Sequence, residues 1–143
     1  MTLNTYLVFS GQAEEAFKFY AQCLNAQILA SFKHADTPAA AHVPPDWQDK
    51  IMHGSLRIGD QVLMAGDVAP ERYEEPKGFS LSLQMNDTSQ AERVFNELAA
   101  NGRIVMPLEK TFWADRFGMV VDRFGIPWLI NCDGSDGTEP VTH

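Results

Sequence analysis

Two stretches of this chain match each other without a gap: Arg57-Ile-Gly-Asp-Gln-Val-Leu-Met-Ala-Gly-Asp67 and Arg123-Phe-Gly-Ile-Pro-Trp-Leu-Ile-Asn-Cys-Asp133. Four of the eleven positions are identical, among them a glycine at the third and a leucine at the seventh. A glycine followed by an apolar run is typical of a strand that begins after a tight turn. Because an internal repeat decides an architecture before any single element does, this pair predicts two similar modules.

The repeat extends upstream with a change of spacing. Leu24-Asn-Ala-Gln-Ile28 pairs with Ala100-Asn-Gly-Arg-Ile104, and both are typical of a helix end followed by a strand. These segments lie 76 residues apart, whereas the first pair lies 66 apart, so the first half carries an insertion of 10 residues. The segment Lys33 to Lys50 fits this insertion, because it holds three prolines and three consecutive alanines without a sustained period. We expect a loop or lid there.

Two amphipathic helices are predicted, one in each half. The first covers Ala13 to Leu24, where apolar residues recur at the spacing of one helix face. The second begins at a capping box of Ser89 and Glu92 and ends near Gly102, where a left-handed residue is expected. The stripes that should pack against a sheet are Ala13, Ala16, Phe17, Tyr20, Cys23 and Leu24 in the first helix, and Ala91, Val94, Phe95 and Leu98 in the second.

Strand-like runs surround each helix in the same order. One run precedes each helix and three follow it, so each half reads βαβββ. We expect one pseudo-symmetric α+β domain, 1–143, made of module one (4–67), a charged and proline-containing linker (68–77), module two (78–133) and a tail (134–143). The expected strands are Tyr6 to Phe9, Gln27 to Phe32, Ile51 to Ile58, Gln61 to Ala65, Phe79 to Gln84, Arg103 to Leu108, Gly118 to Asp122 and Pro127 to Cys132.

The composition favours some classes of protein and argues against others. The chain has 143 residues, 45% of them hydrophobic, which is typical of one globular domain. A net charge of −8, with the basic residues spread along the chain, makes nucleic acid a poor partner. No stretch is long and apolar enough for a membrane span, and no basic residue precedes the first apolar run. With only Cys23 and Cys132, both in apolar surroundings, we expect a reduced, cytoplasmic protein.

Local motifs tie this architecture to a known superfamily. They are Tyr6-Leu-Val-Phe-Ser-Gly11, Ala16-Phe-Lys-Phe-Tyr20, Thr111-Phe-Trp-Ala-Asp-Arg-Phe-Gly118 and Trp128-Leu-Ile-Asn131. On these residues the chain resembles the PhnB-like branch of the vicinal oxygen chelate superfamily, which includes glyoxalase I, fosfomycin-resistance and bleomycin-binding proteins, and extradiol dioxygenases. The resemblance implies two tandem modules that form a curved eight-stranded mixed sheet with a cup, and helices packed outside it. It implies no single reaction, because a fold does not determine a function.

The resemblance also implies a position for a metal. In the superfamily the ligands are His or Glu on the first and last strand of each module, facing the cup. We map these positions to Thr5, Leu63, Gly78 or Phe79, and Leu129. None of these side chains replaces a carboxylate or imidazole ligand, so we expect no metal at the usual position and predict no cofactor.

A relocated divalent metal is possible but disfavoured. It would use His53 with a carboxylate such as Glu109 or Asp115, since the spacing of the histidines matches no ligand pattern. His34 and His42 lie on the insertion and are expected to be surface or hydrogen-bonded residues. Strand alternation places His53 either in the cup or toward solvent, so it is a candidate ligand contact and, with less support, a catalytic acid or base.

Several residues are candidates for binding a small organic molecule. Phe112 and Trp113 could stack on a planar ligand and Trp47 could close over it, although packing explains these rings equally well. Trp128 is expected in the core. Arg57 and Arg123 are interpreted as matching turn residues that pair with Asp60 and Asp122. The candidate ligand-binding residues are Thr5, Trp47, His53, Ser80, Ser82, Trp113 and Asn131.

Three functions remain open from the sequence. The first is a binding module for a small, partly apolar organic molecule without the usual metal site. The second is a lyase, isomerase or dioxygenase-type enzyme that uses His53 or a relocated metal, and the third is a degenerate fold retained for oligomerisation. PhnB-like sequences are often described as demethylubiquinone methyltransferases, but the chain has no Gly-x-Gly loop to support that description. A homodimer is expected, because four aromatic residues should lack cover within one chain: Phe112, Trp113, Phe117 and Phe124.

Overall fold

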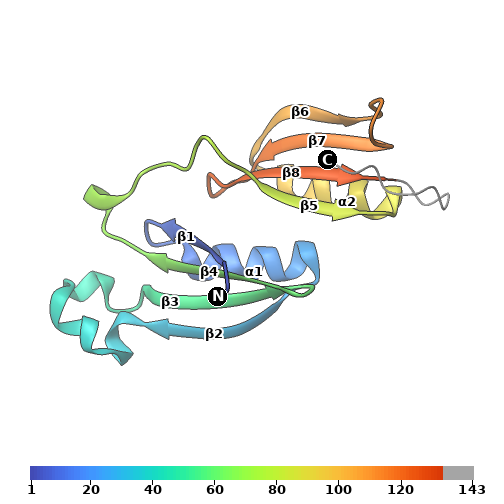
Figure 1. The fold of residues 1–143 in the computed structure, drawn as a ribbon. Coiled ribbons are helices and arrows are strands. Elements are labelled where there is room, and N and C mark those ends of the chain that lie inside the picture. The colour runs from blue at the N-terminus through green and yellow to red at the C-terminus, as the bar shows by residue number, and fades with distance from the viewer. Residues whose placement is uncertain (134–143) are drawn as a thin grey trace. The chain divides into compact units, whose positions relative to one another are not determined.

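The computed structural model describes residues 1–133 and is shown in Figure 1. The chain divides into two compact units between Glu74 and Glu75, which lies within the predicted linker. Each unit holds one α-helix and one four-stranded sheet. No helix among the described residues is long and apolar enough to cross a membrane. The predicted tail, with His143, lies outside the described residues.

The first unit is a βαβββ module with an insertion. Its elements are β1 (Thr5–Phe9), α1 (Ala13–Leu24), β2 (Gln27–Lys33), β3 (Ile51–Ile58) and β4 (Gln61–Asp67). The strand order is β1-β4-β3-β2, with β1 parallel to β4 and the other neighbours antiparallel. The insertion between β2 and β3 folds into three short 3₁₀ turns, His34–Asp36, Pro38–His42 and Pro45–Trp47.

The second unit repeats this topology. Its elements are β5 (Leu81–Met85), α2 (Thr88–Ala99), β6 (Arg103–Glu109), β7 (Arg116–Val121) and β8 (Pro127–Cys132), and a 3₁₀ turn at Pro70–Arg72 precedes them. The strand order is β5-β8-β7-β6, again with one parallel pair. The tandem βαβββ prediction is therefore confirmed. The described hydrogen bonds define two four-stranded sheets, and the single eight-stranded sheet with a cup stays a prediction.

Each sheet has one face packed against the helix of its own unit. In the first unit the ring of Phe17 on α1 lies against Gly54 of β3, and in the second the ring of Phe95 on α2 lies against Gly118 of β7. The predicted helix stripes are buried except for Leu24, which is half-buried, and Trp128 is in the core, with 1% of its surface exposed. We call the opposite side of each sheet its helix-free face. Strand register places Tyr6, His53, Ser55 and Met64 on this face in the first unit, and Ser82, Gln84, Phe117, Leu129 and Asn131 in the second.

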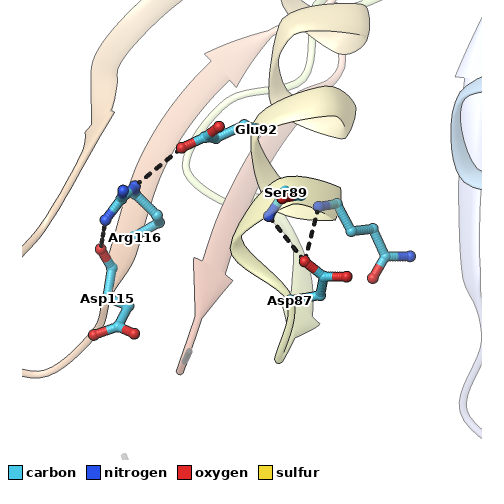
Figure 2. Close-up of polar contacts among 6 residues, drawn as sticks. Asp87, Ser89, Glu92, Asp115 and Arg116 are labelled. Carbon is cyan, nitrogen blue, oxygen red and sulfur yellow. Dashed lines mark hydrogen bonds and ion pairs between the residues drawn. The ribbon is translucent and has the colours of Figure 1, made fainter. Parts of the chain in front are cut away.

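Both predicted ends of α2 are wrong by one or two residues. The N-cap is Asp87, whose carboxylate accepts hydrogen bonds from the backbone N–H groups of Ser89 and Gln90, as Figure 2 shows. Ser89 therefore lies inside the helix, and the predicted capping box with Glu92 does not form. Glu92 instead pairs with Arg116 of β7, 3.4 Å away. At the other end the left-handed residue is Asn101, with φ of 60°, and not Gly102.

The two halves differ by one residue in the register of their last strand. Gln61 follows a two-residue turn after Ile58, whereas Pro127 follows the longer turn that begins after Val121. As a result Leu63 lies on the helix-packed face, while Leu129, its partner in the sequence repeat, lies on the helix-free face. A shift of one residue exchanges the two faces of a strand. The gapless match therefore identified the topology correctly but not the facing of the side chains.

Candidate functional site

A fixed amide network lies on the helix-free face of the second unit. The Nδ2 atom of Asn131 donates to Oε1 of Gln84 at 2.9 Å, and Nε2 of Gln84 donates to Oδ2 of Asp133 at 2.6 Å. Asn131 Nδ2 also reaches Oδ1 of Asp133 at 3.4 Å. Asn131 is 4% exposed, and its Oδ1 accepts no hydrogen bond from residues 1–133. The network therefore leaves one buried acceptor without a donor.

Aromatic rings extend from this network. Phe117 is the cross-strand neighbour of Asn131, and its ring meets that of Trp113 edge to face with centroids 5.3 Å apart. Phe112 packs on the other side of Trp113 at 4.7 Å and is itself 96% exposed. The loop that carries both rings is held by Thr111, whose Oγ1 accepts from the backbone N–H groups of Trp113 and Ala114. The half-buried ring of Phe117 thus belongs to the strand neighbour of Asn131, and the half-buried ring of Trp113 packs against it.

The helix-free face of the first unit carries a different pair. The rings of Tyr6 and His53 stack with centroids 5.8 Å apart and an interplanar angle of 30°. The Tyr6 hydroxyl donates to the carbonyl oxygen of Met52 at 3.5 Å. Burial raises the pKa of the Tyr6 phenol above its ordinary value of 10.0, and the negative charge of Asp67 raises it further. Tyr6 therefore stays a hydrogen-bond donor at neutral pH.

Asp67 organises the start of α1. Its Oδ1 accepts from the backbone N–H groups of Gly11 and Ala13, and its Oδ2 accepts from that of Ile51. Gln12, at the N-cap position, makes no side-chain capping bond, so a carboxylate from β4 caps the helix instead. Asp67 is 5% exposed, and three backbone donors explain how its charge is accommodated. We assign it a structural role.

The structure brings together three of the residues predicted for the site. Ser82, Trp113 and Asn131 lie in the second unit, where Ser82 and Asn131 share the helix-free face. Ser80 directly precedes β5. Sequence reasoning missed Gln84 and Phe117 as their neighbours, although alternation with Ser82 placed Gln84 on the same face. The involvement of these residues in binding a ligand stays a prediction.

The remaining predicted site residues lie elsewhere. His53 is half-buried beside Tyr6, and its catalytic role stays a prediction. Trp47 lies in the insertion, where Nζ of Lys50 is 5.9 Å from its ring centroid. Thr5 pairs in register with the buried Leu63 and shares a sheet face with Leu7, toward α1. Its expected place in a cup stays a prediction.

The residues at the superfamily's metal positions do not fit a metal ion. Thr5 and Leu63 lie on the helix-packed face of the first sheet, and Leu129 offers no donor atom. Gly78 and Phe79 precede β5. Residues 1–133 contain no group of three or more His, Cys, Asp or Glu side chains that could hold a metal ion. We therefore derive no chemistry through a metal. His53 belongs to one unit and Glu109 and Asp115 to the other, so the relocated site stays a prediction.

Other sequence interpretations need correction. Arg57 lies within β3, opposite Val62, and forms no ion pair with Asp60 in the described part of the chain. Arg123 lies in a turn and donates through Nε to the carbonyl oxygen of Ala100. The two arginines are therefore not equivalent, because the turns differ in length. His34, expected at the surface or hydrogen-bonded, is 8% exposed, and neither ring nitrogen has a hydrogen-bond partner among residues 1–133.

Solved structures define the class of this fold. The glyoxylase/bleomycin resistance protein/dioxygenase domain from Frankia sp. EAN1pec superposes with a TM-score of 0.65 over 93% of this chain and 97% of that one, at 10% identity. At that identity the likeness concerns the fold alone. Together with the paired βαβββ modules, it shows that the protein has the vicinal oxygen chelate fold.

Closer relatives define the family. The family described as 3-demethylubiquinone-9 3-methyltransferase matches residues 1–131, and the chain belongs to it. Protein PA1353 from Pseudomonas aeruginosa is 44% identical, with a TM-score of 0.85 over 94% of this chain and 98% of that one. Protein YjdN from Escherichia coli K12 is 35% identical over 92% of this chain and 95% of its own length. A PhnB protein from Bacillus cereus, called a putative 3-demethylubiquinone-9 3-methyltransferase, is 24% identical with a TM-score of 0.80 over 92% of this chain and 99% of that one.

Proposed function

We propose that this chain is a cytoplasmic small-molecule-binding protein. Its ligand is a planar, partly apolar organic molecule that carries a hydroxyl or amide N–H donor, and it binds on the helix-free face of the second unit without a metal. The observation that carries this proposal is the unpaired, buried Oδ1 of Asn131, whose cross-strand neighbour Phe117 packs against Trp113.

The amide network supports a donor as the recognised group. Gln84 and Asp133 accept from the Nδ2 atom of Asn131, so turning the amide over would break both contacts. The oxygen is thereby held as an acceptor, and an unpaired buried acceptor costs about 1–3 kcal/mol. A ligand donor would recover this free energy. Because the oxygen is closed to solvent, we propose that the side chains that cover it move aside as the ligand enters.

The rings supply the apolar part of the site. Aromatic pairs give large contact area to a planar ligand at little cost in rotamer freedom. The exposed Ser82 offers a further hydroxyl on the same face. The family description names a demethylated quinone, whose reduced form is a planar ring with hydroxyl groups. Such a molecule belongs to the proposed ligand class whether or not this chain transfers a methyl group.

Native mass spectrometry of freshly purified protein tests whether the chain binds an organic ligand without a metal. The expected spectrum contains an organic ligand of low mass and no stoichiometric metal. One Zn, Ni, Mn or Fe ion per chain, confirmed by elemental analysis, would contradict binding without a metal.

A matched pair of probes tests the site itself. 2-Naphthol and 2-methoxynaphthalene share a planar ring, but only the first can donate a hydrogen bond. The wild-type chain should bind 2-naphthol about fivefold to tenfold more tightly, since one hydrogen bond contributes about 1 kcal/mol. Asn131→Ala should remove this preference, whereas Asn96→Ala, on the exposed side of α2, should keep it. Circular dichroism confirms that both variants are folded, and an unchanged preference in folded Asn131→Ala would exclude this site.

A further inference from the structure

The first unit contains a pocket of its own, of about 480 Å³, that the proposed function does not use. It lies between the insertion and the segment that follows β4. Its lining combines the buried His34 and Asp67 with exposed residues, among them Asp46 and Glu71. The residues that carry its chemistry are His34, His42, Asp46, Trp47, Glu71 and Arg72.

His34 is the feature that points to a ligand. Both of its ring nitrogens are buried, and neither has a hydrogen-bond partner among the described residues. The backbone holds the residue in place, because its N–H donates to the carbonyl oxygen of Lys50 at 2.9 Å and its own carbonyl accepts from Thr37. Buried polar groups are nearly always paired, so a partner-free ring in the wall of a pocket indicates a site for a missing partner.

The charge of the pocket indicates which partner fits. The lining residues include the exposed Asp46 and Glu71 and the buried Asp67, and among these lining residues the one guanidinium is that of Arg72. Both carboxylate oxygens of Asp67 already accept from backbone donors, so its charge acts at a distance. The carboxylates of Asp46 and Glu71 have no hydrogen-bond or ion-pair partner among residues 1–133. The chain as a whole carries −8. Carboxylates in excess favour a cation over an anion.

Trp47 provides the apolar wall. Its ring already accepts a cation on one side, where Nζ of Lys50 lies 5.9 Å from the centroid, and Nζ is fixed there by the carbonyl oxygen of Gly11. Val43 and Pro44 extend the apolar surface. An aromatic ring beside carboxylates is the environment in which proteins bind organic ammonium groups.

We propose that this pocket binds a small organic amine. Its ammonium group lies between Asp46 and Glu71 and donates a hydrogen bond to a ring nitrogen of His34, while its apolar body packs on Trp47 and Pro44. This site is independent of the one on the second unit, because the two differ in residues, unit and ligand charge.

Three probes with one skeleton test the charge preference. Phenethylamine, 2-phenylethanol and phenylacetate all contain a benzyl group bonded to one further carbon atom. That carbon carries an ammonium group in the first, carries a hydroxyl group in the second and is the carboxylate carbon in the third. Isothermal titration calorimetry should detect phenethylamine with a dissociation constant near or below about 1 mM, and 2-phenylethanol should bind about tenfold more weakly. No binding of phenylacetate is expected. Equal or tighter binding of phenylacetate, or no binding of phenethylamine, would overturn the proposal.

Histidine side-chain NMR tests the location. Phenethylamine should shift the ring nitrogen resonances of His34 and leave those of His53 unchanged, because His53 lies outside the pocket. Glu71→Gln should weaken phenethylamine about fivefold, whereas Glu74→Gln, an equal change of charge on an exposed residue outside the pocket, should change it less than about twofold. An unshifted His34, or equal effects of the two variants, would place the amine elsewhere. Asn131→Ala should leave phenethylamine binding unchanged, so this site and the proposed function stand or fall separately.

Discussion

The roles of individual polar residues in this protein follow from the hydrogen-bond partners of their side chains. Asp67, Asp87 and Asp122 each accept from backbone N–H groups, and Asp122 also accepts from Nε1 of Trp128 at 2.8 Å. These carboxylates hold turns and a helix start in place. His34 and Asn131 are the described residues with buried side-chain polar atoms that lack a partner. The proposed ligands follow from that contrast.

Replacing Asp67 with Asn should lower the free energy of unfolding. An amide can accept through only one atom, so its NH₂ group would face either Ile51 or the donors of Gly11 and Ala13. We expect a loss of about 1–3 kcal/mol in urea denaturation, because a buried donor is left unpaired. Asp60→Asn, in an exposed turn, is the matched control and should change stability by less than about 0.5 kcal/mol. Equal effects of the two variants would show that the Asp67 contacts contribute little.

Tyr6 should make stability depend on pH in the alkaline range. Its pKa in the folded chain is raised by burial and by Asp67, so the unfolded chain ionises first, at its ordinary value of 10.0. The contribution of Tyr6 is therefore complete below pH 10.0 and is lost as the pH rises through the folded pKa. Absorbance at 295 nm should show a late tyrosine ionisation that disappears in Tyr6→Phe. An ionisation of Tyr6 below pH 10.0 would contradict this assignment.

At the scale of elements, the helix stripes and the bounds of α1, Ala13–Leu24, were predicted well, whereas the residues that cap the helices were not. The stripe of α1 is buried as expected, because a period of 3.6 residues determines which side chains share a face. The ends depend on which side chain reaches the unpaired amides. For α1 that side chain is Asp67, 54 residues beyond Ala13. No local pattern identifies such a cap.

The N-terminus of α2 offers a direct comparison of two candidate caps. Asp87→Ala should lower the free energy of unfolding by about 1 kcal/mol, because Asp87 accepts from Ser89 and Gln90. Ser89→Ala should change it by less than about 0.5 kcal/mol, since Ser89 lies in the first turn of the helix. Thermal or urea unfolding measures both. A larger loss in Ser89→Ala would restore the capping box expected from the sequence.

The C-terminus of α2 depends on a close approach at Gly102. A Cβ atom there would overlap the carbonyl oxygen of Val121 and lie 3.0 Å from backbone atoms of Asp122. Gly102→Ala should therefore destabilise the chain by about 1–3 kcal/mol, because backbone cannot give way as a flexible side chain can. Asn101→Gly should be neutral or stabilising, since φ is 60° there. Urea denaturation measures the free energy of unfolding of both variants. An unchanged free energy of unfolding in Gly102→Ala would show that the backbone around Gly102 relaxes without cost.

At the scale of the whole molecule, two modules of one topology carry different candidate sites. The first has a pocket with excess carboxylate, and the second has an amide and aromatic cluster. One edge strand of each sheet exposes apolar side chains, namely Ile28, Leu29 and Phe32 on β2, and Ile104, Val105 and Met106 on β6. Among the aromatic residues expected to lack cover, Phe112 is exposed, whereas Phe124 is buried at 6% and that expectation was wrong.

We propose that a second copy of the chain covers part of this apolar surface. Exposed edge strands with apolar side chains favour association, and closed twofold pairs are the commonest outcome. Light scattering at micromolar concentration should give twice the chain mass of 16.0 kDa. Val105→Lys, on the edge strand β6, should shift the equilibrium toward the monomer. A mass near 16.0 kDa that is unchanged on tenfold concentration would refute the dimer.

The sequence by itself determined the topology of this protein. Periodicity within one segment and the order of segments predicted both βαβββ modules, both helix stripes and the core position of Trp128. These features are local, because a helix face depends only on its own spacing. They required no knowledge of what each segment contacts.

Only the tertiary structure decided which residues can form a site. The face of a strand depends on its register with a neighbour, and the longer turn after Val121 turned Leu129 away from the helix while Leu63 faces it. The unpaired nitrogens of His34 and the unpaired oxygen of Asn131 result from contacts between segments far apart in the chain. A polar residue looks the same in a sequence whether or not it has a hydrogen-bond partner in the fold, so only the folded structure separates a satisfied side chain from one without a partner.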